Sequence, residues 1–473
     1  MSMTYSEAVE YIINVPRFNK YIDSGLVANA TLLALMKELD NPHLKVKAIH
    51  IAGTNGKGST VQLIKNILVE SGYKVGCFVS PHLIKINERI SIWESLDVNP
   101  SDTYIADEEF LQAFNIVENA YGRVRDNDDA LPSLTFFEYV FAIAAVYFQD
   151  KNLDYCIYET GLGGRLDATN ILSPVITAIT SIGLDHMKLL GDTIDKIAAE
   201  KAGIIKPGIP VVYNTGDQVA DAVISKQAAE LKVDEFNVAK AQYIINDFTP
   251  TGIDFSCTNS YYRYQSINIS SVGIYQVSNA LTAIEVCSNL PGIKTPISQD
   301  IIKSACSKFY WQGRMEQLDG NLIIDGAHNL DAIIPFVKSV RARCGLKEIN
   351  ILFAVADDKN YKDMIEYLCA NLNIKNVYVT AIESDRRVLA KEIADIFQNC
   401  LTRMLCKQCD VVDITLSEDE ADGSTENHIY YHNDLKTVFF KAYKQVKVRD
   451  DILFCVGSLY LIGSIKEIYM EEI

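Results

Sequence analysis

HIAGTNGKGST, residues 50–60, is a glycine-rich turn that lies between an apolar strand at 46–51 and an amphipathic helix starting near Ser59. Its three glycines tolerate positive φ and close approach, so backbone N–H groups can point inward. Lys57 and the N-terminus of the helix add positive potential at the same place. This combination is suited to hold phosphate, and we expect the chain to bind a nucleoside triphosphate.

The spacing of this turn differs from the usual phosphate-binding pattern GxxxxGK[ST]. Only two residues separate its first two glycines, and a third glycine follows Lys57 directly, so no hydroxyl stands beside the lysine. Either Ser59 or Thr60 reaches back to a magnesium ion, or Ser80 supplies the hydroxyl. The alternative is an ordinary tight strand-to-helix turn, which the lysine, the glycines and both flanking elements disfavour.

The chain has 473 residues, of which 48% are hydrophobic, and this is enough for two or three domains with large cores. No apolar stretch approaches the roughly 20 residues of a membrane span, and the first residues lack the basic start and apolar run of a signal peptide. The formal charge of −17 argues against binding DNA or RNA over a broad surface. We expect a cytoplasmic protein that acts on small molecules and binds neither a membrane nor nucleic acid.

Most of the 11 cysteines stand singly in apolar segments, which suits buried thiols in a reducing compartment. Cys406 and Cys409 form a lone CxxC without a second pair or a close pair of histidines, so we assign no metal to them.

Apolar runs alternate with helical patterns along the chain. Runs without polar alternation, such as 154–159 and 175–183, fit parallel strands in a sheet that is covered on both faces. The segment NLPGIKTP, 289–296, has the proline and glycine content of a hinge. We predict an α/β fold with two domains: a parallel-sheet nucleotide-binding domain over 1–292 and a smaller, open, Rossmann-like α/β domain over 297–473.

Polar residues follow four of the strands predicted for the first domain. They are the turn at 53–60, Ser80, Glu159, and the pair Asp185 and His186. Ligands of open parallel sheets bind beyond the carboxyl ends of the strands. A hydroxyl, a carboxylate and an imidazole beside a triphosphate can coordinate Mg²⁺, with water completing the octahedron. Taken singly, His186 could be a hydrogen-bonded loop histidine and Glu159 a solvated strand end.

Seven blocks occur in a characteristic order between about residue 14 and residue 330, and GSLYL near the C-terminus matches more loosely. They are HIAGTNGKGST, SPHL with NERI, ETGLGGRLDATN, LDHMKLLGDTIDKIAAEKAGIIK, the NA pair of GIYQVSNA, WQGRME and IIDGAHN. Together they resemble folylpolyglutamate synthase and dihydrofolate synthase, of the Mur ligase superfamily. The resemblance implies an ATPase domain of the Mur ligase central-domain type, followed by a C-terminal glutamate-ligase domain.

The activity that the resemblance implies is ATP-dependent addition of L-glutamate to the γ-carboxylate of folate, and dihydropteroate is a second acceptor to be tested. The γ-phosphoryl group passes to the acceptor carboxylate, and the amine of glutamate attacks the resulting acyl phosphate. The implied cofactors are ATP and Mg²⁺, with two metal ions expected. We expect a monomer.

The resemblance also implies roles for individual residues. The implied ATP-binding residues are Gly53, Thr54, Asn55, Gly56, Lys57, Gly58, Ser59, Thr60, Asn279, Arg314 and Asp325. The implied metal ligands are Ser80, Glu159, His186 and Lys201, the last as a carbamate. The implied catalytic residues are Lys57, Glu159, His186, Lys201 and His328. From helical periodicity alone, Lys201 is a surface lysine.

Two groups of substrate-binding residues are implied in the same way. His328, Asn329 and Ser458 are expected to bind glutamate, and the pterin side is expected to be lined by Arg17, Phe18, Thr135, Phe137 and Glu138. The phenylalanines of TFFEY, 135–139, could instead belong to the core. Two segments, 22–33 and 383–387, depart from the pattern of the relatives.

Two other functions remain open. A Mur-type peptidoglycan ligase acting on a UDP-sugar peptide is disfavoured by the GLGGRLDATN and SPHL blocks. A non-catalytic nucleotide-binding regulator predicts slow ATP hydrolysis that neither glutamate nor folate changes. A Rossmann oxidoreductase is disfavoured, because neither half shows GxGxxG after a strand with an acidic residue about 20 residues later.

Overall fold

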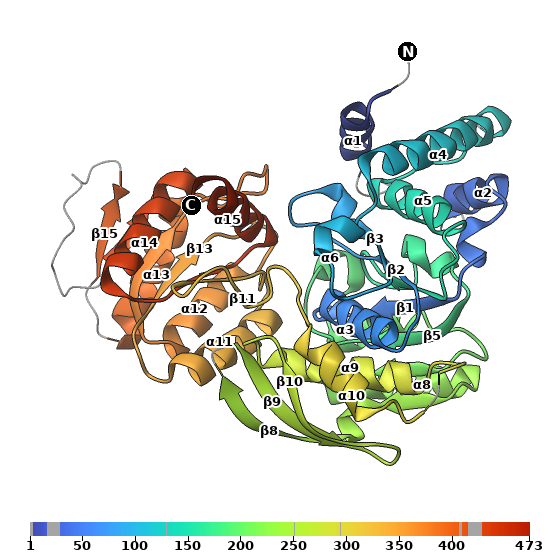
Figure 1. The fold of residues 1–473 in the computed structure, drawn as a ribbon. Helices are drawn as coiled ribbons and strands as arrows, with labels where there is room; N and C mark the ends of the chain where they lie inside the picture. The colour runs from blue at the N-terminus through green and yellow to red at the C-terminus, as the bar shows by residue number, and fades with distance from the viewer. Residues whose placement is uncertain are drawn as a thin grey trace. The chain divides into compact units, whose positions relative to one another are not determined.

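The computed structural model describes residues 3–16, 29–128, 130–249, 251–293, 295–405, 409–414 and 428–473. The described chain divides into two compact units (Figure 1). Unit 1 comprises described residues of 1–244, 255–269 and 278–309, and unit 2 those of 245–254, 270–277 and 310–473. Each unit has its own mixed α/β core, which confirms the predicted fold class. The functional division at residues 292–297 stays a prediction.

Unit 1 is built on a sheet with the strand order β3-β2-β4-β1-β5-β6-β7. Neighbouring strands are parallel except β2 and β3. The central strand β1 is buried at every position, as its apolar sequence predicts. The strands are β1 (Ala48–Ala52), β2 (Val75–Phe78), β3 (Ile90–Trp93), β4 (Tyr155–Glu159), β5 (Pro174–Ile179), β6 (Val211–Tyr213) and β7 (Glu235–Asn237).

Two clusters of buried side chains hold six of the described helices of unit 1 on this sheet. One packs α1, α2, α4 and α5 against β2 and β4, and the other packs α7 and α8 against β5 and β6. The helices are α1 (Tyr5–Ile13), α2 (Ala30–Glu38), α3 (Lys57–Glu70), α4 (Asp107–Asn127), α5 (Phe136–Phe148), α6 (Met187–Leu190), α7 (Ile194–Ala202), α8 (Gln218–Leu231), α9 (Tyr275–Ser288) and α10 (Gln299–Ser307). A separate sheet has the order β10-β9-β8, with β8 (Gln242–Thr249), β9 (Gly252–Thr258) and β10 (Arg263–Ile269).

The helix after the glycine-rich turn starts at Lys57, two residues before the predicted start near Ser59. Gly56 is its N-cap, with φ 86° and ψ −9°, so the chain enters the helix immediately after this glycine. Glycine adopts this left-handed conformation without the penalty that a Cβ would bring. Lys57 therefore lies in the first turn of α3, where the helix N-terminus carries positive potential.

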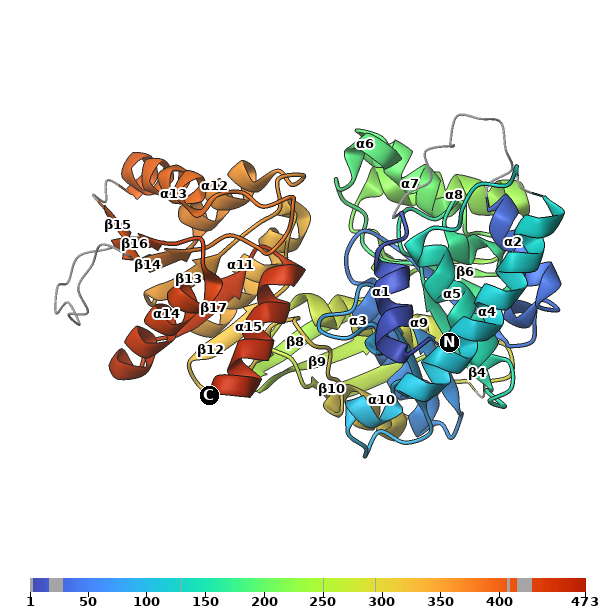
Figure 2. The ribbon, with the colours of Figure 1, turned by 90° about the horizontal axis from the view of Figure 1, so that it is seen from above.

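The sheet of unit 2 has the order β11-β12-β17-β13-β14-β16-β15 and is parallel except for β11 against β12. Figure 2 shows α12 and α13 on one side of this sheet and α14 and α15 on the other. The strands are β11 (Glu316–Gln317), β12 (Leu322–Asp325), β13 (Ile349–Phe353), β14 (Ile374–Val379), β15 (Asp410–Asp413), β16 (His428–Tyr431) and β17 (Leu453–Val456). The helices are α11 (Leu330–Cys344), α12 (Tyr361–Asn371), α13 (Ala390–Leu405), α14 (Leu435–Arg449) and α15 (Leu459–Glu472).

Among the described helices, none combines the length and the apolar character that a membrane crossing requires.

Candidate active site

The glycine-rich turn follows β1 and fits closely against its neighbours. A Cβ atom at Gly56 would lie 2.5 Å from Asn279 Oδ1, and one at Gly53 would lie 1.8 Å from Thr180 Oγ1. Gly53 is therefore required by space, and Gly56 by its positive φ, since a Cβ there would displace the Asn279 side chain. The first contact also places Asn279, which lies on α9 and is far away in the sequence, directly against the turn.

Thr54 and Asn55 attach the turn to the loop that follows β5. The Thr54 N–H donates to Ser181 O at 2.7 Å, and the Thr54 hydroxyl donates to Gly183 O at 3.2 Å. The Asn55 carbonyl accepts from the hydroxyls of Thr180 at 2.8 Å and Ser181 at 3.1 Å. These bonds fix the shape of the turn from the neighbouring strand end.

The three hydroxyls considered for a metal ion, those of Ser59, Thr60 and Ser80, differ in exposure. Ser59 and Thr60 are 2% and 0% exposed, and the Thr60 hydroxyl is buried without a hydrogen-bond partner among the described residues. Ser80 is half-buried at the end of β2, and its N–H donates to Glu159 Oε2 at 3.0 Å. Gly58, in the first turn of α3, is half-buried.

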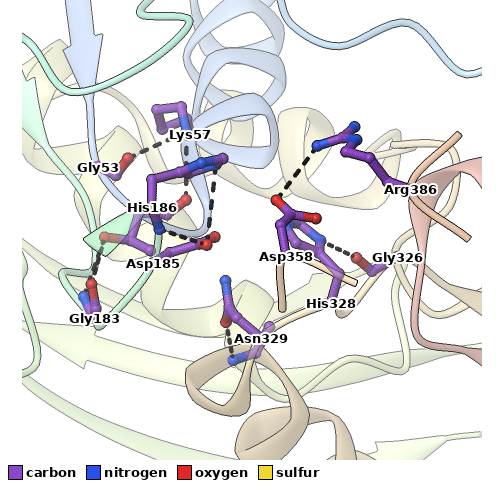
Figure 3. Close-up of polar contacts among 12 residues, drawn as sticks. Gly53, Lys57, Gly183, Asp185, His186, Gly326, His328, Asn329, Asp358 and Arg386 are labelled. Carbon is purple, nitrogen blue, oxygen red and sulfur yellow. Dashed lines mark hydrogen bonds and ion pairs between the residues drawn. The ribbon is translucent and has the colours of Figure 1, made fainter. Parts of the chain in front are cut away.

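Glu159, the last residue of β4, links the ends of the neighbouring strands. Its Oε1 lies 3.9 Å from Lys57 Nζ, and its Oε2 accepts from Ser80 N–H. Lys57 Nζ also donates to Gly53 O at 3.2 Å and to Thr54 O at 3.4 Å (Figure 3). Three strand ends that are far apart in sequence thus bring an ammonium, a carboxylate and a hydroxyl-bearing residue together.

Lys201, on α7, is 3% exposed, so the alternative of a surface lysine is wrong. Its Nζ donates at 2.8 Å to Gly53 O, the carbonyl that also accepts from Lys57. Burial and the charge of Lys57 lower the pKa of Lys201 to about 7, against the opposing effects of Asp185 and Asp167. A substantial fraction of this amine is therefore neutral at neutral pH, and neutral amine is the form that reacts with CO₂.

His186 follows β5 and is the N-cap of α6, with φ 50° and ψ 37°. Its N–H donates to Asp185 Oδ1 at 2.8 Å, and its Nε2 lies 4.0 Å from the same oxygen (Figure 3). The His186 side chain is 37% exposed. Because β5 is the neighbour of β1, His186 belongs to the same edge of the sheet as the glycine-rich turn.

The donor set at this edge suits a hard divalent cation. Ser80 and Glu159 would supply oxygen atoms and His186 a ring nitrogen, a set that fits the modest protein ligation that Mg²⁺ accepts beside phosphate and water. Among the described residues, no group of three or more histidine, cysteine, aspartate or glutamate side chains is placed to hold a metal. The set proposed here instead combines one serine, one glutamate and one histidine.

Two of the residues implied for ATP, Arg314 and Asp325, belong to unit 2. Asp325 is 2% exposed at the end of β12, and its carboxylate accepts from Tyr275 OH at 2.6 Å, Met315 N–H at 2.9 Å and Ala327 N–H at 2.8 Å. Burial raises the pKa of Asp325, although Arg314 and these bonds oppose the effect. This geometry favours a supporting role, in which Asp325 holds the loop that carries Arg314.

The residues implied for glutamate follow two neighbouring parallel strands of unit 2, β12 and β17. Asn329 Oδ1 accepts from Ala332 N–H at 2.8 Å and caps α11, and Ser458 Oγ accepts from Tyr460 N–H at 3.2 Å and caps α15. His328 Nδ1 lies 2.7 Å from Gly326 O (Figure 3). Two helix N-termini thus begin side by side, which provides positive potential for a carboxylate.

Sequence reasoning gave no role to Asp358 and Arg386, which lie after β13 and β14 in unit 2. Arg386 Nη1 is 3.3 Å from Asp358 Oδ2 (Figure 3). Arg386 Nη2 is 3.4 Å from Tyr460 OH. The Arg386 side chain is 42% exposed, so its guanidinium reaches solvent at the carboxyl edge of the sheet. The segment 383–387 drew attention only as a departure from the relatives, and that departure was the available signal.

The residues implied for the pterin side are only partly described. Thr135 and Glu138 cap each other at the start of α5: Thr135 N–H and Oγ1–H both donate to Glu138 Oε2 at 2.7 Å. Phe137 packs on Phe78, with ring centroids 5.5 Å apart, and also packs against Gly161. Arg17 and Phe18, which were also predicted for the pterin side, lie outside the described residues. So does Cys406 of the CxxC pair, to which we assigned no metal.

A second pair at the same end of α5 was missed, although the NERI and SPHL blocks contained it. Arg89 Nε donates to His82 Nδ1 at 2.7 Å, and the Arg89 guanidinium lies 5.2 Å from the centre of the Phe136 ring. Arg89 is 7% exposed. An arginine stacked on an aromatic ring presents positive charge beside a flat apolar face, which suits contact with a flat, partly anionic molecule.

The two units match two known domain families in the order that the sequence predicted. Residues 135–287 match the Mur ligase middle domain, and residues 313–459 match the Mur ligase glutamate ligase domain. The class of protein that the fold and the strand-end residues define is therefore a Mur-type ligase.

Comparison with individual proteins shows to which family of Mur-type ligases the chain belongs. The chain is 33% identical over 439 residues to the dihydrofolate synthase/folylpolyglutamate synthase of Bacillus subtilis, which covers 92% of this chain and 93% of that protein. Folylpolyglutamate synthase of Thermotoga maritima, a crystal structure, is 26% identical with a TM-score of 0.76 and covers 99% of this chain and 97% of that one. A folylpolyglutamate synthase in complex with AMPPCP and folate is 28% identical, with a TM-score of 0.78 and coverage of 98% and 99%. The chain belongs to the folylpolyglutamate synthase and dihydrofolate synthase family.

Proposed function

We propose that this protein is an ATP-dependent ligase that joins L-glutamate to a folate-type carboxylate. The observation that carries the proposal is the convergence of Lys57, Ser80, Glu159 and Lys201 around one glycine-rich turn in a chain of this family. The relative solved with AMPPCP and folate indicates the two substrates to test first. A peptidoglycan ligase and a non-catalytic regulator have no comparable support.

We assign ATP to the N-terminal domain and the amino acid to the C-terminal domain. Lys57 and the N-terminus of α3 hold the triphosphate, with Asn279 beside the turn. Mg²⁺ at Ser80, Glu159 and His186, with a second ion at a carbamate on Lys201, would neutralise the phosphate oxygens. Arg314 is a further charge partner for the transferring phosphoryl group, because a guanidinium can bind two oxygens at once.

The acceptor carboxylate needs activation, because it is a poor electrophile with a poor leaving group. Transfer of the γ-phosphoryl group of ATP gives an acyl phosphate, the neutral amine of glutamate attacks its carbonyl carbon, and inorganic phosphate leaves from the tetrahedral intermediate. Lys57 stabilises the negative charge that develops on the transferred group.

His328 is the proposed base that removes a proton from the incoming amine. Its Nδ1 lies 2.7 Å from a carbonyl oxygen, Gly326 O, which can only accept, so Nδ1 carries the hydrogen. In the neutral ring the lone pair is then on Nε2, the atom that can take a proton. Asn329, Ser458 and Arg386 are proposed to bind the carboxylates of glutamate, since they lie at helix N-termini or carry a guanidinium.

One experiment tests the activity and separates the two acceptors. Purified protein is incubated with ATP, Mg²⁺ and L-glutamate together with either dihydropteroate or tetrahydrofolate, and ADP release and product mass are followed. We expect glutamate-dependent ADP release with at least one acceptor and a product heavier by one glutamyl residue. The absence of stimulation by both acceptors would overturn the proposal. Size-exclusion chromatography with light scattering tests the expected monomer.

A further inference from the structure

A buried network of hydrogen bonds in unit 2 connects Lys466 to the loop 310–316 and takes no direct part in the proposed chemistry. Lys466, on α15, is 8% exposed, and its Nζ donates to Glu316 Oε1 at 2.8 Å, Tyr310 OH at 2.8 Å and Gln312 Oε1 at 3.3 Å. The Glu316 side chain is also 8% exposed. Its Oε1 accepts from Tyr310 OH at 2.7 Å, and its Oε2 accepts from Gly313 N–H at 2.7 Å.

The same loop carries Arg314, and its backbone is in an unusual conformation. Gly313 and Met315, on either side of Arg314, both have positive φ, 66° and 47°. A non-glycine residue in this region costs about 1 kcal/mol or more, so Met315 needs support from its surroundings. Asp325 gives that support from one side by accepting from Met315 N–H at 2.9 Å, and Glu316 gives it from the other through Gly313 N–H.

The position of Arg314 depends on this backbone. A Cβ atom on Gly326 would lie 2.2 Å from Arg314 Nη1, so the guanidinium lies directly on the backbone at the end of β12. The Gly326 N–H donates to Gly313 O at 2.8 Å, and Arg314 Nη1 donates to the same carbonyl at 3.3 Å. Any change in the orientation of the peptide at Gly313 would therefore move the guanidinium.

We propose that Lys466 and Glu316 form a buried brace that positions Arg314 for the nucleotide. The brace is defined by these two residues, and the proposal rests on the role given to Arg314 in the proposed function. A buried ion pair is a poor source of stability, because desolvation cancels most of the attraction and apolar residues of the same size serve as well or better. The brace instead fixes the conformation of the loop. Glu316 accepts hydrogen bonds from Tyr310 OH and from Gly313 N–H, and Gly313 directly precedes Arg314.

The test separates positioning from stability by comparing two lysines of unit 2. Lys466→Met removes the brace, and Lys375→Met removes a half-buried ion pair of the same unit, Lys375 Nζ to Asp451 Oδ2 at 2.7 Å, which lies away from the loop. We expect K466M to raise KM for ATP about tenfold, equal to about 1.4 kcal/mol, with KM for glutamate unchanged. K375M should lower the melting temperature and leave KM for ATP unchanged. K466R, which keeps donors for the same oxygens, should restore most of the affinity.

A double-mutant cycle shows whether the effect passes through Arg314. In an R314A background, adding K466M should leave KM for ATP unchanged, because the group that the brace positions is already absent. An unchanged KM for ATP in folded K466M would overturn the proposal, and so would a tenfold rise that persists in the R314A background. If K466M fails to fold, E316Q takes its place in the cycle, since it keeps an acceptor for Gly313 N–H and removes the charge.

Failure of the ligase proposal remains distinguishable from failure of the brace. Wild-type protein is first tested for glutamate-dependent ADP release. If that turnover is absent, the proposed function fails, and the same cycle is measured on the dissociation constant of AMPPCP by calorimetry. A tenfold weaker binding in K466M that requires Arg314 supports the brace, whereas equal binding, or no binding by the wild type, overturns it.

Discussion

Replacing Lys201 by methionine should stabilise unit 1 at neutral pH and abolish turnover at the same time. Burial, with the charge of Lys57 as the second cause, lowers the pKa of Lys201 to about 7 from the 10.5 of an exposed lysine. Because one pKa unit corresponds to about 1.4 kcal/mol, the buried amine costs the folded state roughly 4 kcal/mol at pH 7. Loss of the hydrogen bond to Gly53 O offsets about 1 kcal/mol of that gain. We expect K201M to be more stable by about 3 kcal/mol.

The sign of the pH dependence follows from the direction of the shift. Between pH 7 and pH 10.5 the unfolded chain binds more protons at Lys201 than the folded chain does, so the stability of the wild type rises with pH across this window. The cost is fully present below pH 7 and is relieved as the pH rises. The advantage of K201M should therefore shrink from about 3 kcal/mol at pH 7 to about 1 kcal/mol at pH 9.

Urea unfolding at pH 6, 7 and 9 in CO₂-free buffer measures this difference, because a carbamate would change the charge of Lys201. The chain has two units, so unit 1 is followed by the fluorescence of its buried Trp93, in a background in which Trp311 of unit 2 is replaced by phenylalanine. Lys196→Met is the matched control on the same helix, since Lys196 pairs with Asp192 at the surface and its removal should bring no gain at pH 7. The reasoning is refuted if K201M is less stable than the wild type at pH 7, or if the difference is the same at pH 7 and pH 9.

Two further predictions concern the strand-end residues of unit 1. E159Q should reduce glutamate-dependent ADP release by about 100-fold or more without changing the melting temperature, and near-normal release would exclude Glu159 as a metal ligand. G56A should weaken AMPPCP binding by about tenfold or more in calorimetry, because a Cβ would lie 2.5 Å from Asn279 Oδ1 at φ 86°. The control is G72A, which has a similar φ of 89° and nothing within 4 Å of its Cβ; equal binding by G56A and G72A would contradict the proposed contact.

The buried parallel strands β1, β4 and β5 of unit 1 could be predicted because each carries its own apolar signal. The apolar runs at 46–51, 154–159 and 175–183 became β1, β4 and β5, since parallel strands in this sheet are buried on both faces. The position of β4 between β1 and β2 could not be predicted, because strand order depends on which helices pack together and not on any local pattern. The edge strand β3, which pairs antiparallel with β2, was not predicted.

The site residues likewise divide into those whose positions a local sequence pattern predicts and those whose positions depend on packing between distant segments. Ser80 and Glu159 could be expected to meet, because the carboxyl ends of neighbouring parallel strands share one edge of a sheet. The burial of Lys201 could not be predicted from α7, whose polar pattern resembles a surface helix; it follows from packing against the Gly53 carbonyl. Asp325 carries the same signal as Glu159, an acid at a strand end, yet its carboxylate accepts from Tyr275 OH, which no local pattern predicts, as well as from Met315 N–H and Ala327 N–H.

The Gly53 carbonyl brings together two lysines from different helices, Lys57 of α3 and Lys201 of α7, whose surroundings differ. It accepts from Lys57 at 3.2 Å and from Lys201 at 2.8 Å, so it holds two amines close together although their charges repel. Lys57 Nζ lies 3.9 Å from Glu159 Oε1, whereas Lys201 is buried and its pKa falls to about 7. The arrangement places Lys57 at the phosphate-binding turn and makes the amine of Lys201 available in its neutral, reactive form. The same burial that makes Lys201 reactive destabilises the fold, so a more stable variant at this position is expected to be an inactive one.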